Sequence, residues 1–178
     1  MIKMIQKLKN KKGFTLVELI VVIAIIAILT AVIVPLVGRY AANATYTTLQ
    51  DAAKTVSSTA NTVLADITQT GDVFKSQLII GSKSGTTLTI KADGGLTDSD
   101  AGNKTKLETE LQSALQEAVP AGASFAVQVT DNTVSAVVYS TKATLTSIVS
   151  VVKVGEGQYE YNNNPIGVYG NVTATDKE

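Results

Sequence analysis

An apolar run from Phe14 to Val37 dominates the hydropathy pattern of the chain, and Thr15, Glu18 and Thr30 interrupt it with polar side chains. As a helix, these 24 residues measure about 36 Å at 1.5 Å per residue, which exceeds a hydrocarbon core of about 30 Å. Five lysines and no acidic residue precede Gly13. Because positively charged flanks stay in the cytoplasm, the pattern predicts a membrane-spanning helix with a cytoplasmic N-terminal end.

A second helical pattern follows Gly38. Apolar residues recur there at alternating spacings of three and four, which places them on one helix face: Tyr46, Leu49, Ala53, Val56, Ala60, Val63 and Ile67. Gly71-Asp72 is a plausible stop, so a single helix of about 85 Å is predicted from Phe14 to about Thr70. Its first half is apolar all round, whereas its second half is amphipathic and is expected to lie against a sheet. Pro35 lacks an amide proton and should weaken the hydrogen bonding locally.

The apolar segments after residue 73 are short and rich in β-branched side chains, which is typical of strands. Strands are predicted at Leu78–Ile80, Thr86–Ile90, Phe125–Val129, Val134–Tyr139, Leu145–Val154 and Gln158–Tyr161. A helix is the alternative for Leu145–Val154. Turns are expected at Gly81–Gly85, Asp93–Gly95, Asp131-Asn132 and Gly155–Gly157. Asn162–Pro165 is interpreted as a break, after which Ile166–Glu178 is expected to be a surface tail.

One short helix is predicted among these strands. Thr105-Lys106-Leu107-Glu108 has the form of a capping box, in which Thr and Glu side chains bond to each other's backbone N–H groups. Pro120 and Gly122 end the helix, and one of its sides carries Leu107, Leu111, Ala114, Leu115 and Ala118. The preceding Asp98–Asn103 has a passing likeness to a calcium loop. It lacks the full spacing and the terminal bidentate acid, so a solvated loop is expected.

Composition narrows the chemistry that the chain can perform. There is no cysteine, histidine or tryptophan, which excludes thiol nucleophiles, Ser-His triads and disulfides, and no metal or cofactor is predicted. A membrane-anchored exported enzyme is therefore disfavoured. Of the fifteen basic residues, five precede Gly13, so ten remain against fifteen acidic residues and the chain after Gly13 is near −5. An acidic surface argues against nucleic-acid binding.

The segment from Gly13 to Ile20 (Gly-Phe-Thr-Leu-Val-Glu-Leu-Ile) resembles the prepilin signature of type IV pilins and their pseudopilin relatives. The resemblance consists of a basic leader ending in Gly, then Phe, an acid four residues further on and a long aliphatic helix, and it covers Lys11 to about Gly38. It implies an α+β fold with a long N-terminal spine helix packed against an antiparallel β-sheet head. The absence of cysteine makes the chain similar to pilins of Gram-positive anaerobes, and packing and hydrogen bonds must hold its C-terminal region.

The resemblance also implies roles for particular residues. A membrane-bound prepilin peptidase would cut between Gly13 and Phe14, and the new amino group of Phe14 would be methylated. Pro35 matches the helix-kinking proline of the family, and Gly38 is a second weak point. The implied division is a leader at 1–13, a transmembrane and filament-core half-helix at 14–38, and a head at 39–178.

Glu18 has two interpretations. The resemblance implies that its carboxylate pairs with the positively charged terminus of a neighbouring subunit during assembly. An amine with a pKa near 8 and a carboxylate can neutralise each other where water is scarce. Alternatively, Glu18 complements the positive end of its own helix, worth about 0.3–1 kcal/mol.

Two other interpretations of the whole apolar segment are an uncleaved anchor and an ordinary signal peptide cut after Ala42-Asn43-Ala44.

The function implied by the resemblance is structural. The chain would be a type IV pilus subunit, the major one, that polymerises into a surface filament for adhesion, motility or aggregation. Its partners would be copies of itself, prepilin peptidase, an assembly ATPase and a membrane platform protein, with the cytoplasmic membrane as its location before assembly. A pseudopilin of a type II secretion or competence system is the alternative. Tyr159, Tyr161 and Tyr169 are expected to pack in the sheet, with contacts to a neighbouring subunit as the alternative.

Overall fold

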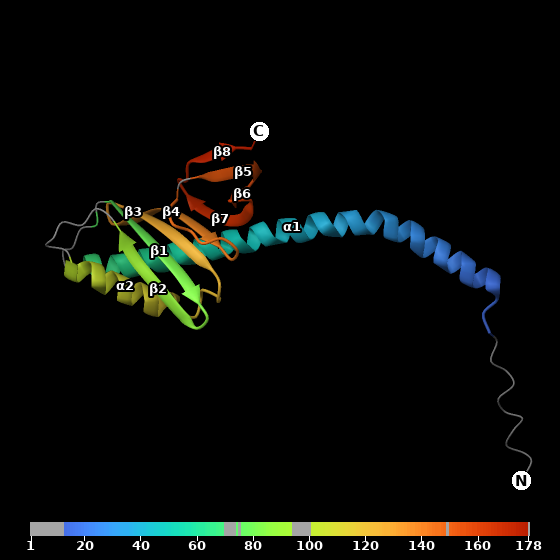
Figure 1. The fold of residues 1–178 in the computed structure, drawn as a ribbon, viewed down its shortest axis with the longest axis horizontal. Helices are drawn as coiled ribbons and strands as arrows, with labels where there is room; N and C mark the ends of the chain where they lie inside the picture. Colours follow the sequence, from blue (N-terminus) through green and yellow to red (C-terminus); the bar gives the residue numbers. More distant parts are fainter. Residues whose placement is uncertain (1–12, 70–73, 75, 94–100, 149, 178) are drawn as a thin grey trace, which may run out of the picture. The chain divides into compact units, whose positions relative to one another are not determined.

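The computed structural model describes residues 13–69, 74, 76–93, 101–148 and 150–177, and the chain divides into two compact units. We call Met1–Ala41 the stem and Ala42–Glu178 the head, and consider each by itself. The elements in chain order are α1 (Leu16–Thr68), β1 (Ser76–Ser84), β2 (Thr87–Asp93), α2 (Ala101–Leu115), β3 (Ser124–Thr130), β4 (Thr133–Ser140), β5 (Val151–Gly155), β6 (Gln158–Tyr161), β7 (Asn164–Gly170) and β8 (Ala174–Asp176) (Figure 1).

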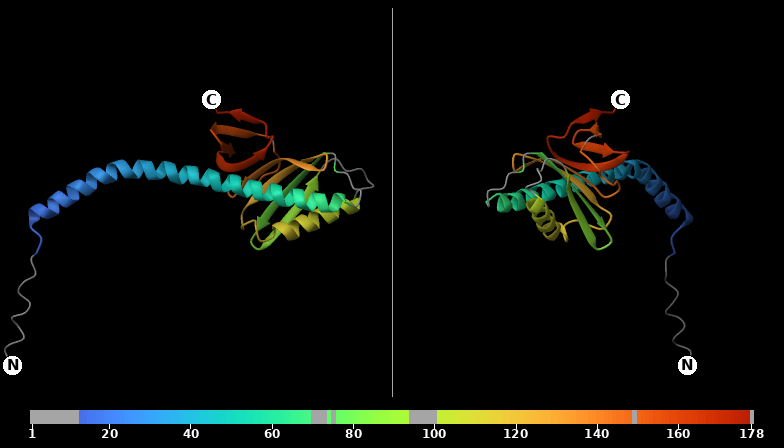
Figure 2. Two further views of the ribbon diagram at one scale, coloured as in Figure 1. Left: turned by 180° about the vertical axis from the view of Figure 1, so that it is seen from behind. Right: turned by 60° about the vertical axis from the view of Figure 1, so that its left-hand side comes forward.

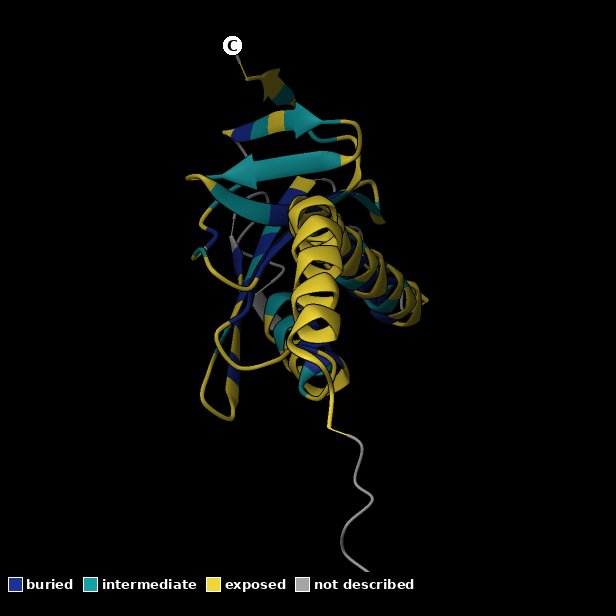
Figure 3. Cartoon of the chain, turned by 90° about the vertical axis from the view of Figure 1, so that its right-hand side faces the viewer, coloured by how far each residue is buried: buried dark blue, intermediate teal, exposed yellow. Residues whose placement is uncertain are grey.

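The long helix predicted from the hydropathy pattern is confirmed as α1. It begins at Leu16, two residues after the predicted start, and it includes both Pro35 and Gly38 without a break in helix assignment. The predicted stop at Gly71-Asp72 lies outside the described residues. Every stem residue of α1 is exposed, as the yellow colour of this half of the helix shows (Figure 3). A kink at Pro35 or Gly38 stays a prediction.

The head half of α1 buries the predicted apolar face. Leu49, Ala53, Val56, Ala60, Val63 and Ile67 are all buried, and Ser57 and Leu64 join them. Tyr46, at the stem end of the stripe, is half-buried. This face and α2 cover the same side of strands β1 to β4, and together they enclose the main hydrophobic core (Figure 2). The helix is therefore held in the head by apolar burial, the dominant favourable term in folding.

Among the described residues, the sheet has eight strands in the order β2-β1-β3-β4-β7-β6-β5-β8. All neighbouring pairs are antiparallel except β5 and β8, which are parallel. The predicted α+β fold, with a spine helix on a mainly antiparallel head, is thereby confirmed. The turn predicted at Asp131-Asn132 is also present: both residues have positive φ (48° and 63°), which suits a two-residue hairpin loop between β3 and β4.

The first hairpin is longer than predicted, because Gly81 is not part of its turn. Gly81 lies inside β1, where a Cβ atom would come within 2.1 Å of Cζ of Phe125 on β3. The residue therefore makes room for an aromatic ring, a use of glycine that a sequence pattern does not distinguish from a turn. The turn itself is at Gly85, whose φ is +58°.

The predicted start of the short helix is wrong, and three of the five residues of its predicted apolar face are buried. α2 begins at Ala101, so Thr105–Glu108 lies within the helix and does not cap it. Oε1 of Glu108 instead accepts a hydrogen bond from the backbone N–H of Ala92 at the end of β2 (2.8 Å). Ala101–Asn103, the second half of the segment that resembles a calcium loop, is helical and therefore is not a loop. The first half, 98–100, lies outside the described residues. Leu107, Leu111, Leu115 and Val119 form the buried face, whereas Ala114 and Ala118 are exposed.

The C-terminal predictions need the largest corrections. Only Val151–Gly155 of the strand predicted from Leu145 pairs in the sheet; Leu145 is fully buried in an irregular segment, where its N–H donates to Oγ of Ser124 (3.1 Å). Asn162 and Asn163 form a turn with positive φ (51° and 58°) and lead directly into β7. Ile166 is fully buried, so the first part of the expected surface tail is an inner strand of the sheet, whereas residues 171–177 are exposed or half-buried, as expected.

Strand β7 links the two halves of the sheet. Its first residues pair with β6, and Gly167–Gly170 pair with β4. Pro165 therefore lies where only β6 is a neighbour, which explains how a residue without an N–H is tolerated inside the sheet. At Gly167 the strand contacts the backbone of α1: a Cβ atom would come within 1.8 Å of the carbonyl oxygen of Leu49.

The opposite face of the sheet has a second, smaller core. It consists of Ala126, Val138, Leu145, Val151 and Ile166, and Tyr159 and Tyr161 pack against it. Sheet packing is therefore the correct interpretation for these two tyrosines. Tyr169 remains 43% exposed.

Candidate assembly site at the N-terminal end of α1

The stem half of α1 exposes an apolar surface that the protein leaves uncovered. Phe14 is 88% exposed, and apolar side chains remain exposed along the helix as far as Tyr40. Among the described residues, α1 is a helix long and apolar enough to cross a membrane, and none of its most apolar window is buried. A core helix of a soluble protein would be mostly buried, so this explanation does not fit. Lipid or the same surface of other copies could cover such a helix.

Thr15 and Glu18 close a capping box at the start of α1. Oε2 of Glu18 accepts hydrogen bonds from the backbone N–H of Thr15 (2.8 Å) and from the hydroxyl of Thr15 (2.8 Å). In return, Oγ1 of Thr15 accepts a bond from the backbone N–H of Glu18 (3.2 Å). Two backbone donors at the helix terminus are satisfied in this way, and the negative charge lies at the positive end of the helix dipole.

Sequence reasoning missed this capping box although its signal is present. Thr15-Leu16-Val17-Glu18 has the same Thr-x-x-Glu spacing as Thr105-Lys106-Leu107-Glu108, and it precedes the strongest apolar run of the chain. A cap is predicted at Thr105, but a helical turn precedes that residue in α2. None is predicted at Thr15, directly before the first residue of α1. The structure thus supports the second interpretation of Glu18, that it serves its own helix. Both bonds to the carboxylate end on its Oε2 atom.

The bond between Gly13 and Phe14 lies in accessible backbone. Gly13, Phe14 and Thr15 precede the helix and are exposed, and no atom lies within 4 Å of where a Cβ of Gly13 would be. A peptidase needs an accessible segment, and residues 13–15 are exposed and not helical. Further along, Pro35 offers no N–H to the carbonyl of Ala31, and Gly38 is exposed in open surroundings.

Polar bonds tie the head half of α1 to the turn between β5 and β6. Nε2 of Gln50 donates to the carbonyl of Gly157 (2.5 Å), and Nε2 of Gln158 donates to Oδ1 of Asn43 (2.8 Å). A signal-peptide cut after Ala44 would remove Asn43 and sever α1 within the head, which argues against that alternative.

A third tie involves Tyr46, whose hydroxyl donates to Oε1 of Glu160 on β6 (3.1 Å). Burial raises the pKa of Tyr46, and the Glu160 carboxylate adds to the effect. The other oxygen of Glu160 lies 3.2 Å from Nζ of Lys177, at the end of the chain. The C-terminal region is thus held by hydrogen bonds and packing, as expected for a chain without cysteine.

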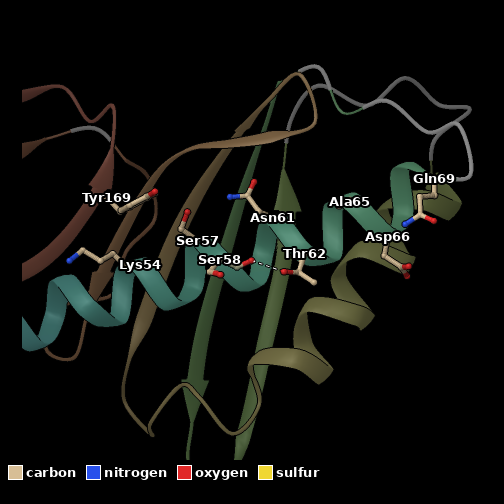
Figure 4. A pocket seen from close by; sticks show the side chains of 9 residues that line it. All are labelled: Lys54, Ser57, Ser58, Asn61, Thr62, Ala65, Asp66, Gln69 and Tyr169. Carbon is tan, nitrogen blue, oxygen red and sulfur yellow. Dashed lines mark hydrogen bonds between the residues drawn. The ribbon is translucent and has the colours of Figure 1, made fainter.

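An open groove of about 810 Å³ runs along the outer face of α1 in the head (Figure 4). It is lined by seven residues of α1 between Lys54 and Asp66, by Gln69 just after the helix, and by Tyr169 of β7. Its ionisable groups are one lysine, one aspartate and one tyrosine; Lys54 lies 3.2 Å from Asp51, outside the groove lining. In the part of the chain that the structure describes, no three acidic residues gather as a metal site would require. The groove therefore gives no support to an enzymatic function.

Comparisons with known proteins bear on the N-terminal segment. Residues 8–34 match the family model described as the prokaryotic N-terminal methylation motif. The chain is also 57% identical, over 51 residues, to the type IV wide pilus major component PilA4 of Thermus thermophilus. That alignment covers 26% of this chain and 39% of the Thermus protein, so the chain matches about two fifths of its relative's length. No solved structure matches the chain.

The methylation motif lies on an exposed apolar helix in a chain with an α+β fold, and this combination is consistent with a type IV pilin. The chain is a type IV pilin-like protein. Pilin families of this kind supply structural subunits. The similarity to pilins of Gram-positive anaerobes stays a prediction, because the relative described above comes from Thermus.

Proposed function

We propose that this chain is the precursor of a type IV pilus subunit, and that its stem helix enters the core of a surface filament after the leader is removed. The observation that supports this most directly is the methylation motif at residues 8–34, which coincides with a helix half that exposes apolar side chains all round. A wholly apolar surface suits lipid before assembly and a bundle of identical helices after it. The major subunit of the filament is the proposed role, and adhesion, motility or aggregation would be properties of the filament.

The proposed processing follows from the same residues. Prepilin peptidase cuts between Gly13 and Phe14, and the amino group of Phe14 is methylated. The leader (1–13) stays in the cytoplasm, residues 14–38 form the membrane and filament-core part, and residues 39–178 form the head. The precursor resides in the cytoplasmic membrane, where an assembly ATPase and a platform protein pass it into the growing filament.

Glu18 is proposed to guide assembly. Its carboxylate pairs with the terminal amine of Phe14 in a neighbouring copy, so that neither charge is left alone in the apolar bundle. An unpaired buried charge costs several kcal/mol, whereas a completed pair is close to neutral in energy. The pairing therefore selects the correct register between subunits. Pro35 and Gly38 are proposed as the places where the stem helix bends to fit the bundle.

Surface filaments provide the test of this function. Shearing of cells that express the chain should release long filaments visible by electron microscopy, and mass spectrometry should identify this chain, starting at a methylated Phe14, as their dominant component. Short periplasmic or envelope-bound fibres in place of long filaments would favour the pseudopilin alternative. Hydrolytic activity of the head, or a mature chain that starts near Thr45, would contradict the proposal altogether.

The division into stem and head predicts that a fragment starting at Ala42 is a soluble, folded monomer. Its core lies wholly within residues 49–166, and the apolar stem that would cause aggregation is absent. The fragment should unfold in a single cooperative transition, independent of reducing agent, when followed by circular dichroism. A fragment that is disordered unless the stem is attached would contradict the division.

Two glycine substitutions in this fragment supply a matched comparison. Gly167→Ala should lower the free energy of unfolding by about 3 kcal/mol, at the upper end of overpacking costs, because rigid backbone of α1 occupies the space. Gly155→Ala meets only the flexible end of Gln158 and should cost about 0.5 kcal/mol, like an ordinary surface change. Equal effects of the two would mean that β7 does not contact α1 as described.

A further inference from the structure

Thr15 is in direct contact with the residue proposed to guide assembly. Its hydroxyl both donates to Oε2 of Glu18 (2.8 Å) and accepts from the backbone N–H of Glu18 (3.2 Å). Its own N–H donates to the same Oε2 (2.8 Å). The Glu18 side chain is otherwise fully exposed, so these bonds are what restrict its rotamers in a single copy.

A free glutamate side chain loses much of its rotamer freedom when it forms an ion pair, and that loss weakens the pair roughly tenfold. The capping box removes this freedom before two subunits meet. It also ends on one carboxylate oxygen, so the other oxygen can accept a bond from an incoming ammonium group. A carboxylate held in this way is preorganised, which increases affinity by reducing the cost of ordering on association.

We infer that Thr15 is a positioning residue for subunit assembly: its hydroxyl holds the Glu18 carboxylate in the orientation that receives the terminal amine of a second copy. This inference rests on the proposed pairing of Glu18. It goes further by assigning a function to the Thr15 hydroxyl and by giving the capping box a role between subunits as well as within one helix.

A purely structural role of Thr15 predicts different behaviour and can be separated. As an N-cap, Thr15 supports its own helix whether or not position 18 carries a charge, so its loss should act independently of the Glu18 charge. As a positioning residue, Thr15 acts only through the Glu18 carboxylate, so its loss should matter little once that carboxylate is gone. Serine retains both functions, and valine, which has nearly the same shape, retains neither.

The test measures how well variant subunits compete with wild-type subunits for a place in the filament. Each full-length variant is co-expressed with the wild-type chain, and mass spectrometry gives its share in sheared filaments relative to its share of processed subunit in the membrane. We expect Thr15→Val to reduce this ratio about tenfold, as for the loss of one hydrogen bond to a charged group. Thr15→Ser should stay within about twofold of wild type. Normalising to processed subunit removes any effect on the peptidase.

A double variant shows whether Thr15 acts through Glu18. In the Glu18→Gln background, Thr15→Val should cause little further loss, because the carboxylate that it orients is already absent. If the losses of incorporation caused by the two single substitutions multiplied in the double variant, the inference would be overturned and Thr15 would be an ordinary cap. Normal incorporation of Thr15→Val, or improved incorporation because the cap had competed with the neighbour's amine, would overturn it as well. If Glu18→Gln itself were incorporated normally, the proposed pairing would fail and the inference with it.

Discussion

Replacing Glu18 by valine should abolish surface filaments while the processed subunit accumulates normally in the membrane. The substitution makes the apolar segment more uniform, so insertion should be unimpaired or improved. The amine of Phe14 would, however, enter the apolar bundle without its counter-charge, at a cost of roughly 3–5 kcal/mol for each subunit, more than a hundredfold in an association constant. Loss of the capping box would by comparison cost about 1 kcal/mol of local helix stability. The measurement is the filament yield by electron microscopy, divided by the amount of processed subunit.

Thr30→Val is the matched control for this experiment. Thr30 is another polar interruption of the same apolar run, but its hydroxyl donates to the carbonyl of Ile26 within its own helix (2.7 Å). Its removal leaves no charge unpaired, so filament yield should be close to that of the wild type. Normal filaments from Glu18→Val would mean that Glu18 only caps α1 and that subunit register is determined elsewhere. Equal losses from both variants would point to general sensitivity of the stem helix.

Replacing Gly13 by valine should prevent removal of the leader. The protein itself does not require glycine at this position: a Cβ at Gly13 would meet no atom within 4 Å. Any defect must therefore arise in the peptidase, whose site has to accommodate the residue before the cleaved bond. We expect the processed fraction to fall at least about tenfold, the scale on which a site rejects added bulk. The precursor should remain in the membrane with its five leader lysines, which mass spectrometry detects directly.

Gly38→Ala provides the comparison for processing. Gly38 also has open surroundings, but it lies in α1 far from the cleaved bond, so its substitution should leave processing unchanged. Cleavage of Gly13→Val at the wild-type rate, with Phe14 first, would show that glycine is not what the peptidase reads. A mature chain starting at Asn43 or Thr45 in both variants would instead support an ordinary signal peptide.

The head illustrates how a chain without cysteine can hold its C-terminal region. Ile166 is fully buried, Gly167 lies against the backbone of α1, and Glu160 connects Tyr46 to Lys177. The contacts of Gly167 with Leu49 and of Glu160 with Tyr46 join residues more than a hundred positions apart in the chain. They stabilise the fold only once β7 has paired between β4 and β6, so the region depends on the completed sheet and not on a covalent link.

The sequence by itself determined the stem and most of the first six strands. The apolar run at Phe14–Val37 and the three-and-four spacing that follows are local patterns, and a helix satisfies its backbone hydrogen bonds within a few residues. The hairpin at Asp131-Asn132 is local for the same reason. The prepilin motif is also contiguous, which is why the class of protein could be inferred from one short segment and then matched by comparison.

Only the tertiary structure decided what depends on distant partners. The local sequence at Asn162-Asn163 is equally compatible with a break and with a hairpin turn. The hairpin forms because it places Ile166 in the second core, where that side chain is buried. Gly81 looks like a turn residue until Phe125 is placed against it. Two identical Thr-x-x-Glu patterns differ in role because α2 already contains a helical turn before Thr105, whereas the described residues before α1, 13–15, are not helical. Strand pairing and burial are long-range, so residues with ambiguous local preferences take the conformation that their neighbours in space allow.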